Sequence, residues 1–246
     1  MIDSVELRDV SLSDEGSAVV VRLPGGELTA RVARELDSAL ADLVEDRTHR
    51  VLILESENPD FCTGAAADVD QASEPGPPGR MEALRLPVIV ALTGRCRSAG
   101  LELALGADIR VAAETTTFAF PDVTEGGLSR WGGIQRLTRA VGTGPALNMV
   151  LLGRELAGAT AYACGLVHDL AADPRARARQ LAAELAERGP LALEYAKEAV
   201  RRGAELPLSD ALRLEADFNH LLQVSHDRAE GLRAFFDKRP PRFEGR

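Results

Sequence analysis

Two carboxylates, Glu102 and Asp122, lie in a part of the chain whose residue pattern could support proton transfer. Residues 87–93 form an apolar run, residues 94–100 form a turn of mostly small residues, and residues 101–108 continue as a helix whose first turn holds Glu102. Asp122 follows an extended stretch downstream. The N-terminus of a helix presents unpaired backbone N–H groups and partial positive charge, so it can receive an oxyanion beside groups that carry protons. The segment therefore predicts acid–base chemistry on a substrate that develops negative charge on oxygen.

The composition of the chain limits the class of protein it can belong to. It has 246 residues, 45% of them hydrophobic, which is ample for a buried core. A net charge of -9 argues against nucleic acid as a partner, because phosphate backbones attract basic surfaces. The three cysteines, Cys62, Cys96 and Cys164, are too scattered for a disulfide framework or a zinc site, so we expect no metal. The chain lacks a signal-peptide pattern and a membrane-spanning apolar run, so we expect a soluble, cytoplasmic protein with no membrane partner.

Strand and helix patterns alternate in the first third of the chain. Residues 18–23 are rich in β-branched side chains and end at a Pro-Gly-Gly turn, which predicts a strand. Residues 29–45 carry apolar side chains at helical spacing, and residues 50–55 have the composition of a buried strand. This β-α-β order predicts a parallel pair of strands with a right-handed crossover.

Helical patterns dominate the end of the chain. Residues 73–79 are rich in proline and glycine and predict a flexible loop, whereas residues 88–92, 109–113 and 115–120 favour extended structure. Helices are expected near residues 134–137, 144–152, 159–165, 174–188, 190–202, 208–223 and 227–238. We therefore predict an α/β core over residues 1–190 and a helical region over residues 191–246 that packs on itself or on a neighbouring subunit.

Four sequence blocks resemble those of the enoyl-CoA hydratase/isomerase (crotonase) superfamily. They span nearly the whole chain in the family's order and cover residues 61–68, 87–108, 118–137 and 230–243. The first reads Phe-Cys-Thr-Gly-Ala-Ala-Ala-Asp, similar to the family's F-x-x-G-A-D block, and the last reads Glu-Gly-Leu-Arg-Ala-Phe-Phe-Asp-Lys-Arg-Pro-Pro-Arg-Phe. The resemblance implies a ββα spiral core, a helical C-terminal trimerisation region, and a homotrimer or homohexamer.

The resemblance also implies a site for an acyl-CoA thioester. Members of this superfamily stabilise an enolate at the thioester oxygen with two backbone N–H groups, which correspond here to Ala65, after Gly64, and Ala99, before Gly100. The expected position of Ala99 at a helix N-terminus agrees with this role. The alternative interpretation of these small residues is close packing at a turn. No separate cofactor is implied, because coenzyme A is part of the substrate.

Glu102 and Asp122 correspond to the two acid–base positions of hydratases in this superfamily, both commonly glutamate. Asp122 is one methylene shorter, and catalytic geometry tolerates small errors only, so hydration could be slower. The alternatives are a carboxylate favoured by the helix dipole for Glu102 and a turn residue for Asp122. The resemblance thus implies an enoyl-CoA hydratase, with an isomerase, a decarboxylase or carbon–carbon lyase, or a non-catalytic acyl-CoA-binding protein as alternatives.

Several residues depart from the family pattern around the expected acyl group. Glu125 stands where the family usually has an apolar residue, and Ser129-Arg130 replace a Pro-Gly pair. Arg130 could pair with Asp122 or Glu125, could recognise a charged acyl tail, or could be an exposed loop residue. Trp131 is expected to form a pocket wall or a packing anchor.

Coenzyme A requires partners for its phosphates despite the acidic net charge. The resemblance implies Arg22, near the end of the first predicted strand, and Lys238, which could reach a neighbouring subunit's ligand. It also implies Ala66 and Asp68 in the first block. Both cations are otherwise ordinary surface residues.

Overall fold

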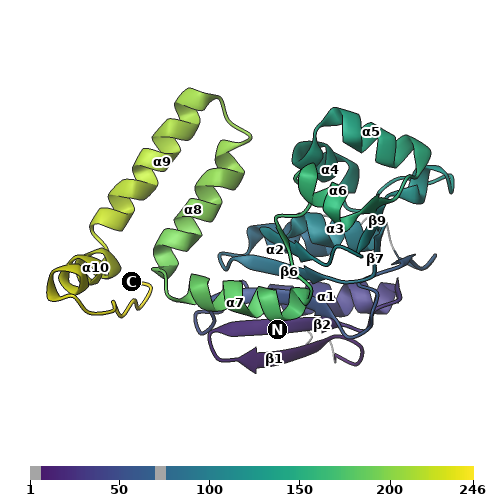
Figure 1. Cartoon of the computed structure of the whole chain (residues 1–246). Helices are drawn as coiled ribbons and strands as arrows, with labels where there is room; N and C mark the ends of the chain where they lie inside the picture. Colours follow the sequence, from purple (N-terminus) through teal and green to yellow (C-terminus); the bar gives the residue numbers. More distant parts are fainter. Residues whose placement is uncertain (1–6, 70–75) are drawn as a thin grey trace.

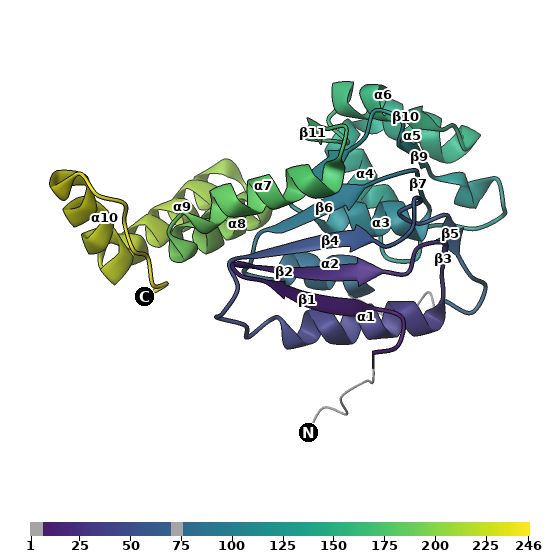
Figure 2. The same ribbon diagram turned by 60° about the horizontal axis from the view of Figure 1, so that its bottom comes forward.

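A six-stranded sheet forms the centre of the protein, with helices on both of its faces (Figures 1 and 2). The computed structural model describes residues 7–69 and 76–246. The strand order is β1-β2-β4-β6-β8-β11, in which β1 and β2 are antiparallel and all other neighbours are parallel. The strands are β1 (Ser11–Glu15), β2 (Ala18–Leu23), β4 (Val51–Ser56), β6 (Val88–Leu92), β8 (Ile109–Ala112) and β11 (Asp169–Leu170).

The sheet buries a different set of side chains on each face. Val20, Ile53 and Ile89 pack with Ala178 and Ala182 of α7 (Pro174–Ala186) on one face. The alternate residues of the same strands join a larger core cluster on the other face, which includes residues of α1 (Ala30–Asp42), α2 (Gly76–Ala83) and α3 (Ala99–Gly106). Because strand side chains alternate between faces, a strand covered on both sides reads as a continuous apolar run. This confirms the parallel, buried sheet predicted from the sequence.

Three short strand pairings hold the backbone segments that precede the predicted site. β3 (Glu27–Leu28) pairs in parallel with β5 (Gly64–Ala65), and β7 (Arg95–Arg97) pairs in parallel with β9 (Thr117–Ala119). A parallel backbone β-bridge between the free cysteines Cys62 and Cys96 joins the β3–β5 pair to the β7–β9 pair. Strand β10 (Leu156–Ala157) pairs antiparallel with β9. The segments around residues 64, 98 and 120 therefore end side by side. The helices that follow are η1 (Pro121–Val123), α4 (Gly133–Val141), α5 (Thr143–Leu152) and α6 (Gly158–Ala163).

Helix α2 begins inside the proline-glycine cluster, so the predicted loop was wrong for residues 76–79. It contains Pro77 and Pro78 in its first turn. The first four N–H groups of a helix have no intrahelical acceptor, so proline loses no hydrogen bond there. A Cβ on Gly106 of α3 would lie 2.7 Å from the Pro78 backbone, so the glycine allows the two helices to pack closely. Residues 73–75 lie outside the described part of the chain.

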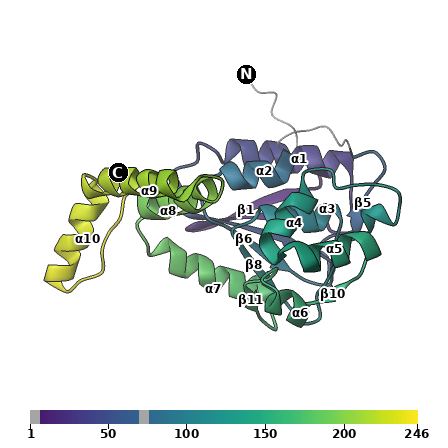
Figure 3. The same cartoon turned by 90° about the horizontal axis from the view of Figure 1, so that it is seen from above.

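The last three helices form an arm that extends away from the sheet (Figures 1 and 3). We call the helices α8 (Pro190–Gly203), α9 (Leu208–Gln223) and α10 (His226–Asp237) the C-terminal arm. Tyr195 and Phe218 stack with ring centroids 5.1 Å apart and join α8 to α9. Lys197 anchors α8 to the core by an ion pair of 2.8 Å with Asp108. Neither α8 nor α9 contains a fully buried residue.

No helix in the described ranges is both long enough and apolar enough to cross a membrane.

Candidate active site

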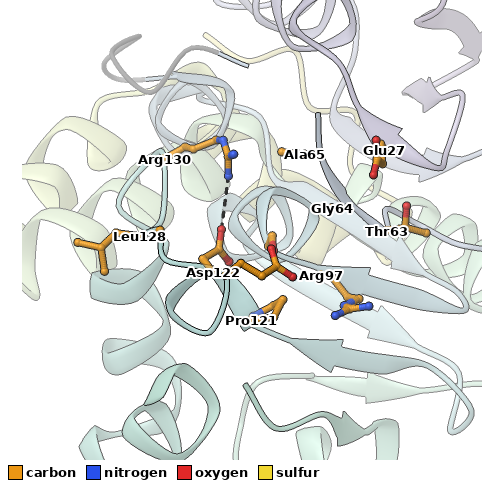
Figure 4. Close-up of a pocket in the computed structure, with 12 residues that line it drawn as sticks. Glu27, Thr63, Gly64, Ala65, Arg97, Pro121, Asp122, Leu128 and Arg130 are labelled. Atoms are coloured by element: carbon orange, nitrogen blue, oxygen red, sulfur yellow. Dashed lines mark hydrogen bonds and ion pairs between the residues drawn. The ribbon is translucent and has the colours of Figure 1, made fainter. Parts of the chain in front are cut away.

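A cavity of about 340 Å³ lies where the short strands end (Figure 4). The residues predicted for the site that line it are Gly64, Ala65, Asp122, Glu125 and Arg130. The lining residues that sequence reasoning did not single out are Glu27, Thr63, Arg97, Ser98, Pro121, Gly127 and Leu128. Charged and polar side chains therefore outnumber apolar side chains around this cavity.

The backbone around Ala65 is fixed by hydrogen bonds to β3. The Thr63 N–H donates to the Gly26 carbonyl and the Ala66 N–H donates to the Leu28 carbonyl, both at 2.9 Å. Between them Gly64 has a φ of 152°, a conformation that residues with a side chain rarely adopt. A glycine is therefore required at position 64, because the backbone conformation that presents Ala65 to the cavity is one that other residues rarely adopt.

The turn before Ala99 is strained and tightly held. Ser98, a non-glycine residue, has a φ of 46° and donates its N–H to the Ala119 carbonyl at 3.1 Å. Such a conformation costs about 1–3 kcal/mol and persists only where the surroundings enforce it. Gly100 allows this turn to pack closely against Cys62, because a Cβ there would lie 2.4 Å from the Cys62 Cβ. Ala99 is the first residue of α3, where backbone N–H groups have no intrahelical acceptor.

Glu102 is a fully buried carboxylate with three backbone N–H donors. Its Oε1 accepts from Arg130 at 2.8 Å, and its Oε2 accepts from Trp131 at 2.7 Å and from Gly133 at 2.9 Å. Burial raises the pKa of Glu102 above its ordinary value, the nearby Asp122 adds to this rise, and the three hydrogen bonds oppose it. Glu102 does not line the cavity and instead holds residues 130–133 in place.

Asp122 lies in η1 and presents its carboxylate to the cavity. Its Oδ1 is 3.4 Å from the Arg130 Nη1, an ion pair drawn in Figure 4. Its Oδ2 is buried and has no hydrogen-bond partner among the described residues. The Gly127 N–H donates to the Asp122 backbone carbonyl at 2.7 Å, which closes the loop that carries Glu125. The structure therefore brings Asp122 and Arg130 together, as one of the sequence-based alternatives predicted.

Trp131 is buried away from the cavity. It packs under the start of α2, where a Cβ on Gly76 would lie 2.5 Å from the indole ring. Of the two interpretations made from sequence, the structure favours a packing anchor. Glu125 lies on the exposed rim, and Gly100 is buried behind the turn.

The residues expected to bind coenzyme A lie in different surroundings. Arg22 is occupied by Glu55 and Glu15, each at 2.8 Å, and it does not line the cavity. Asp68 accepts the Ala30 N–H at the start of α1 at 3.2 Å. Ala66 adjoins Ala65, whereas Lys238 caps the C-terminus of α10 on the C-terminal arm. The contacts of Arg22 and Asp68 give these two residues structural roles.

Arg97 is the most informative lining residue that sequence reasoning missed. It belongs to the block at residues 94–100, where it stands among small residues, so the signal was present in the sequence. Within residues 7–69 and 76–246, no group of three or more His, Cys, Asp or Glu residues could hold a metal ion.

Comparison of the sequence with known proteins gives one consistent family. Residues 26–246 match the family model described as enoyl-CoA hydratase/isomerase. A probable enoyl-CoA hydratase of Mycobacterium tuberculosis is 34% identical over 230 residues, which cover 89% of this chain and 90% of the relative. The 2,3-dehydroadipyl-CoA hydratase of Escherichia coli is 41% identical over 169 residues, covering 68% of this chain and 66% of the relative. The rat methylglutaconyl-CoA hydratase, 35% identical over 98% of this chain and 84% of its own, is mitochondrial, so a cytoplasmic location stays a prediction.

Solved structures show the same fold. An enoyl-CoA hydratase from Bacillus anthracis superposes with a TM-score of 0.91 at 28% identity, covering 97% of this chain and all (100%) of the other. A structure from Streptomyces coelicolor, described as a putative enoyl-CoA hydratase, has a TM-score of 0.91 at 31% identity, covering 100% of this chain and 98% of the other. The expected α/β crotonase fold with C-terminal helices is thus confirmed. The chain belongs to the enoyl-CoA hydratase/isomerase (crotonase) superfamily.

Proposed function

We propose that the protein is an enzyme that adds water to the double bond of a 2-enoyl-CoA thioester. The observation that carries this proposal is the free oxygen of Asp122, which is buried, lacks a hydrogen-bond partner in the described part of the chain, and belongs to a residue that lines the cavity. A carboxylate oxygen without a partner is available to take a proton. The names of the relatives from M. tuberculosis and E. coli support the same reaction class.

In this proposal the thioester oxygen binds to the backbone N–H groups of Ala65 and Ala99. Two features support this placement, namely the rigid backbone on either side of Ala65 and the strained turn that orients Ala99. Fixed N–H donors stabilise negative charge most where little rearrangement is needed during the reaction. Electron density that leaves the double bond can then accumulate on the thioester oxygen as an enolate.

Asp122 carries the proton in this scheme. It takes a proton from the attacking water while the water oxygen bonds to C3, and the electrons of the C2–C3 double bond move toward the thioester oxygen. The proton then passes from Asp122 to C2, so that one water has been added and Asp122 is again a carboxylate. We assign Glu102 the role of a positioning residue rather than a second proton carrier, because backbone N–H groups occupy both of its oxygens.

Double-bond isomerisation is the second candidate, since one free carboxylate is sufficient for it. Asp122 would take a proton from C2 of a 3-enoyl-CoA, and after the electrons shift through a dienolate it would return the proton to C4, so that the double bond moves to C2–C3. The full hydrogen bonding of Glu102 favours this candidate, because it leaves Asp122 as the proton carrier of the cavity.

The test follows the conjugated enoyl absorbance with two substrates. Loss of absorbance from crotonyl-CoA, together with a product heavier by one water, supports hydration. A gain of absorbance from a 3-enoyl-CoA supports isomerisation instead. Carbon–carbon cleavage or loss of carbon dioxide from other acyl-CoA substrates would point to a lyase, and binding without turnover of any of them would contradict both catalytic proposals. Asp122→Asn serves as the matched inactive control.

We further propose that the protein assembles as a homotrimer or a dimer of trimers through its C-terminal arm. The support is the absence of fully buried residues in α8 and α9, together with apolar side chains that face solvent, such as Leu208 at 75% and Val224 at 85% exposure. A helix pair with this surface gains stability by burying it against another subunit. Light scattering at micromolar concentration should give at least a trimeric mass, and a monomer with and without coenzyme A would contradict the assembly.

A further inference from the structure

Among the residues that the structure describes, Arg97 is a cation without a counter-ion inside the candidate active site. It is the last residue of β7, and its backbone N–H donates to the Cys62 carbonyl at 3.0 Å. Its side chain lines the cavity, and its Nε is buried without a hydrogen-bond partner among the described residues. Figure 4 shows Arg97 and Arg130 on different sides of Asp122. Arg97 therefore contributes a positive charge that no described carboxylate neutralises.

The neighbouring arginine on the same strand shows how unusual this is. Arg95 lies two residues earlier, is exposed to solvent, and binds Asp60 through its Nε at 3.0 Å and its Nη2 at 2.7 Å. In contrast, Arg97 is half-buried and forms no such pair within the described residues. Removing a guanidinium from water without a partner is unfavourable, and binding an anion would offset that cost.

The position of Arg97 identifies which part of a ligand it would contact. Arg97 lines the same cavity as Ala65, a proposed N–H donor to the thioester oxygen, and Asp122, the proposed proton carrier for the acyl group. The long pantetheine arm separates the thioester from the phosphates of coenzyme A. The ligand group that comes nearest to Arg97 therefore belongs to the acyl end, where a carboxylate is the anion that fits a guanidinium in bidentate fashion.

We propose that the cavity accepts an acyl group with a carboxylate of its own, and that Arg97 binds this carboxylate. The inference rests on the proposed placement of the thioester between Ala65 and Ala99. Three carboxylates also line the cavity, but Asp122 is paired with Arg130, and Glu27 and Glu125 are exposed to solvent, where water and salt screen their charge. The cavity has few apolar side chains that could bind an uncharged acyl tail, since its apolar lining residues are Ala65, Pro121 and Leu128.

The test measures equilibrium binding of acyl-CoA esters that cannot be hydrated. Succinyl-, glutaryl- and adipyl-CoA are each compared with the uncharged saturated ester of equal chain length. The parent should bind at least one carboxylated ester about tenfold to a hundredfold more tightly than its uncharged counterpart. Arg97→Leu should remove this preference, and Arg97→Lys should retain part of it, because an ammonium keeps the charge but not the bidentate geometry.

Arg95→Leu is the matched control, since it removes the same side chain from the same strand outside the cavity, and it should keep the full preference. Two results would overturn the inference. One is a parent without preference at any chain length, and the other is an Arg97→Leu variant that weakens carboxylated esters, uncharged esters and free coenzyme A equally. If Arg97→Leu fails to fold, the parent and Arg97→Lys still decide the outcome. Turnover plays no part in this measurement, so failure of the hydration proposal would be seen separately.

Discussion

Glu102 and Asp122 are both buried, yet the protein surrounds them in opposite ways. Three backbone N–H groups bind the two oxygens of Glu102, whereas Asp122 has one ion pair at 3.4 Å and one oxygen without a described partner. Arg130 connects the two, because its backbone N–H binds Glu102 and its guanidinium binds Asp122. Burial alone thus does not identify a reactive carboxylate. The hydrogen bonds to both oxygens of Glu102 fix the shape of the site, and the partner-free oxygen of Asp122 is the one available for chemistry.

The largest expected effect is on turnover in Asp122→Asn. The substitution keeps the shape of the side chain but removes the proton acceptor, so activity should fall about a hundredfold to ten-thousandfold. Asp122→Glu restores the side-chain length common in hydratases and should hold or raise activity. Steady-state kinetics with crotonyl-CoA would check both variants. If Asp122→Asn hydrates as fast as the parent, Asp122 is not the proton carrier and the contrast with Glu102 loses its functional meaning.

Glu102→Gln should act mainly on stability, with activity falling as residues 130–133 move. A glutamine has one acceptor oxygen, so at least one backbone N–H would face an NH₂ group, and the free energy of unfolding should fall by about 1–3 kcal/mol. The matched control is Glu205→Gln, which removes the charge from an exposed ion pair with Arg139. That control should cost less than about 1 kcal/mol. Chemical denaturation would compare the variants, and equal losses would mean that the hydrogen bonds of Glu102 contribute no special stability.

The pKa of Glu102 predicts the sign of a pH effect. Its pKa is higher in the folded protein than in the unfolded chain, so the native state binds the Glu102 proton more tightly. The stability that Glu102 contributes is therefore largest below the unfolded pKa and decreases as pH rises through the folded pKa. The difference in unfolding free energy between the parent and Glu102→Gln should fall as the pH rises from below the unfolded pKa of Glu102 through its folded pKa. A difference that grows with pH would show that the hydrogen bonds outweigh burial.

A smaller effect is expected from Arg130→Leu. The substitution removes the ion pair with Asp122 but keeps the backbone N–H that Glu102 accepts. Because the ion pair is long at 3.4 Å, turnover should fall about twofold to fivefold. Arg130→Pro provides the opposite case, since it also deletes the backbone N–H and should lose stability. Thermal unfolding of the two variants would separate the roles, and equal melting temperatures would contradict the division between backbone and side chain.

The sequence predicted the elements whose patterns arise from local burial. The strand at residues 18–23 and the helix at residues 208–223 have the expected bounds, because period and β-branching reflect what those segments bury. The start of α2 was missed because its two prolines resemble a turn unless their place in a first helical turn is known. The pairing of Asp122 with Arg130 was anticipated as an option, since the residues lie close in the sequence.

Long-range contacts limited the prediction of the remaining site residues. The sequence around Arg22 does not reveal that its guanidinium forms ion pairs with Glu15 and Glu55, because Glu55 lies on another strand. Glu27 and Thr63 reach the cavity only because β3 pairs with β5. The hydrogen bonding of Glu102 depends on three donors that follow it by 28 to 31 positions. Such contacts are set by the tertiary fold and not by the residues next to each side chain.

The strained backbone of Ser98 places a limit on how stable this protein can become. A glycine at this position would adopt a φ of 46° without steric conflict, so Ser98→Gly would relieve part of the strain. The same change would let the Ala99 N–H point in a wider range of directions. Selection for function can therefore retain a serine that selection for thermostability would remove, and a variant library sorted by melting temperature alone would drift toward stable proteins with poorly aligned thioester donors.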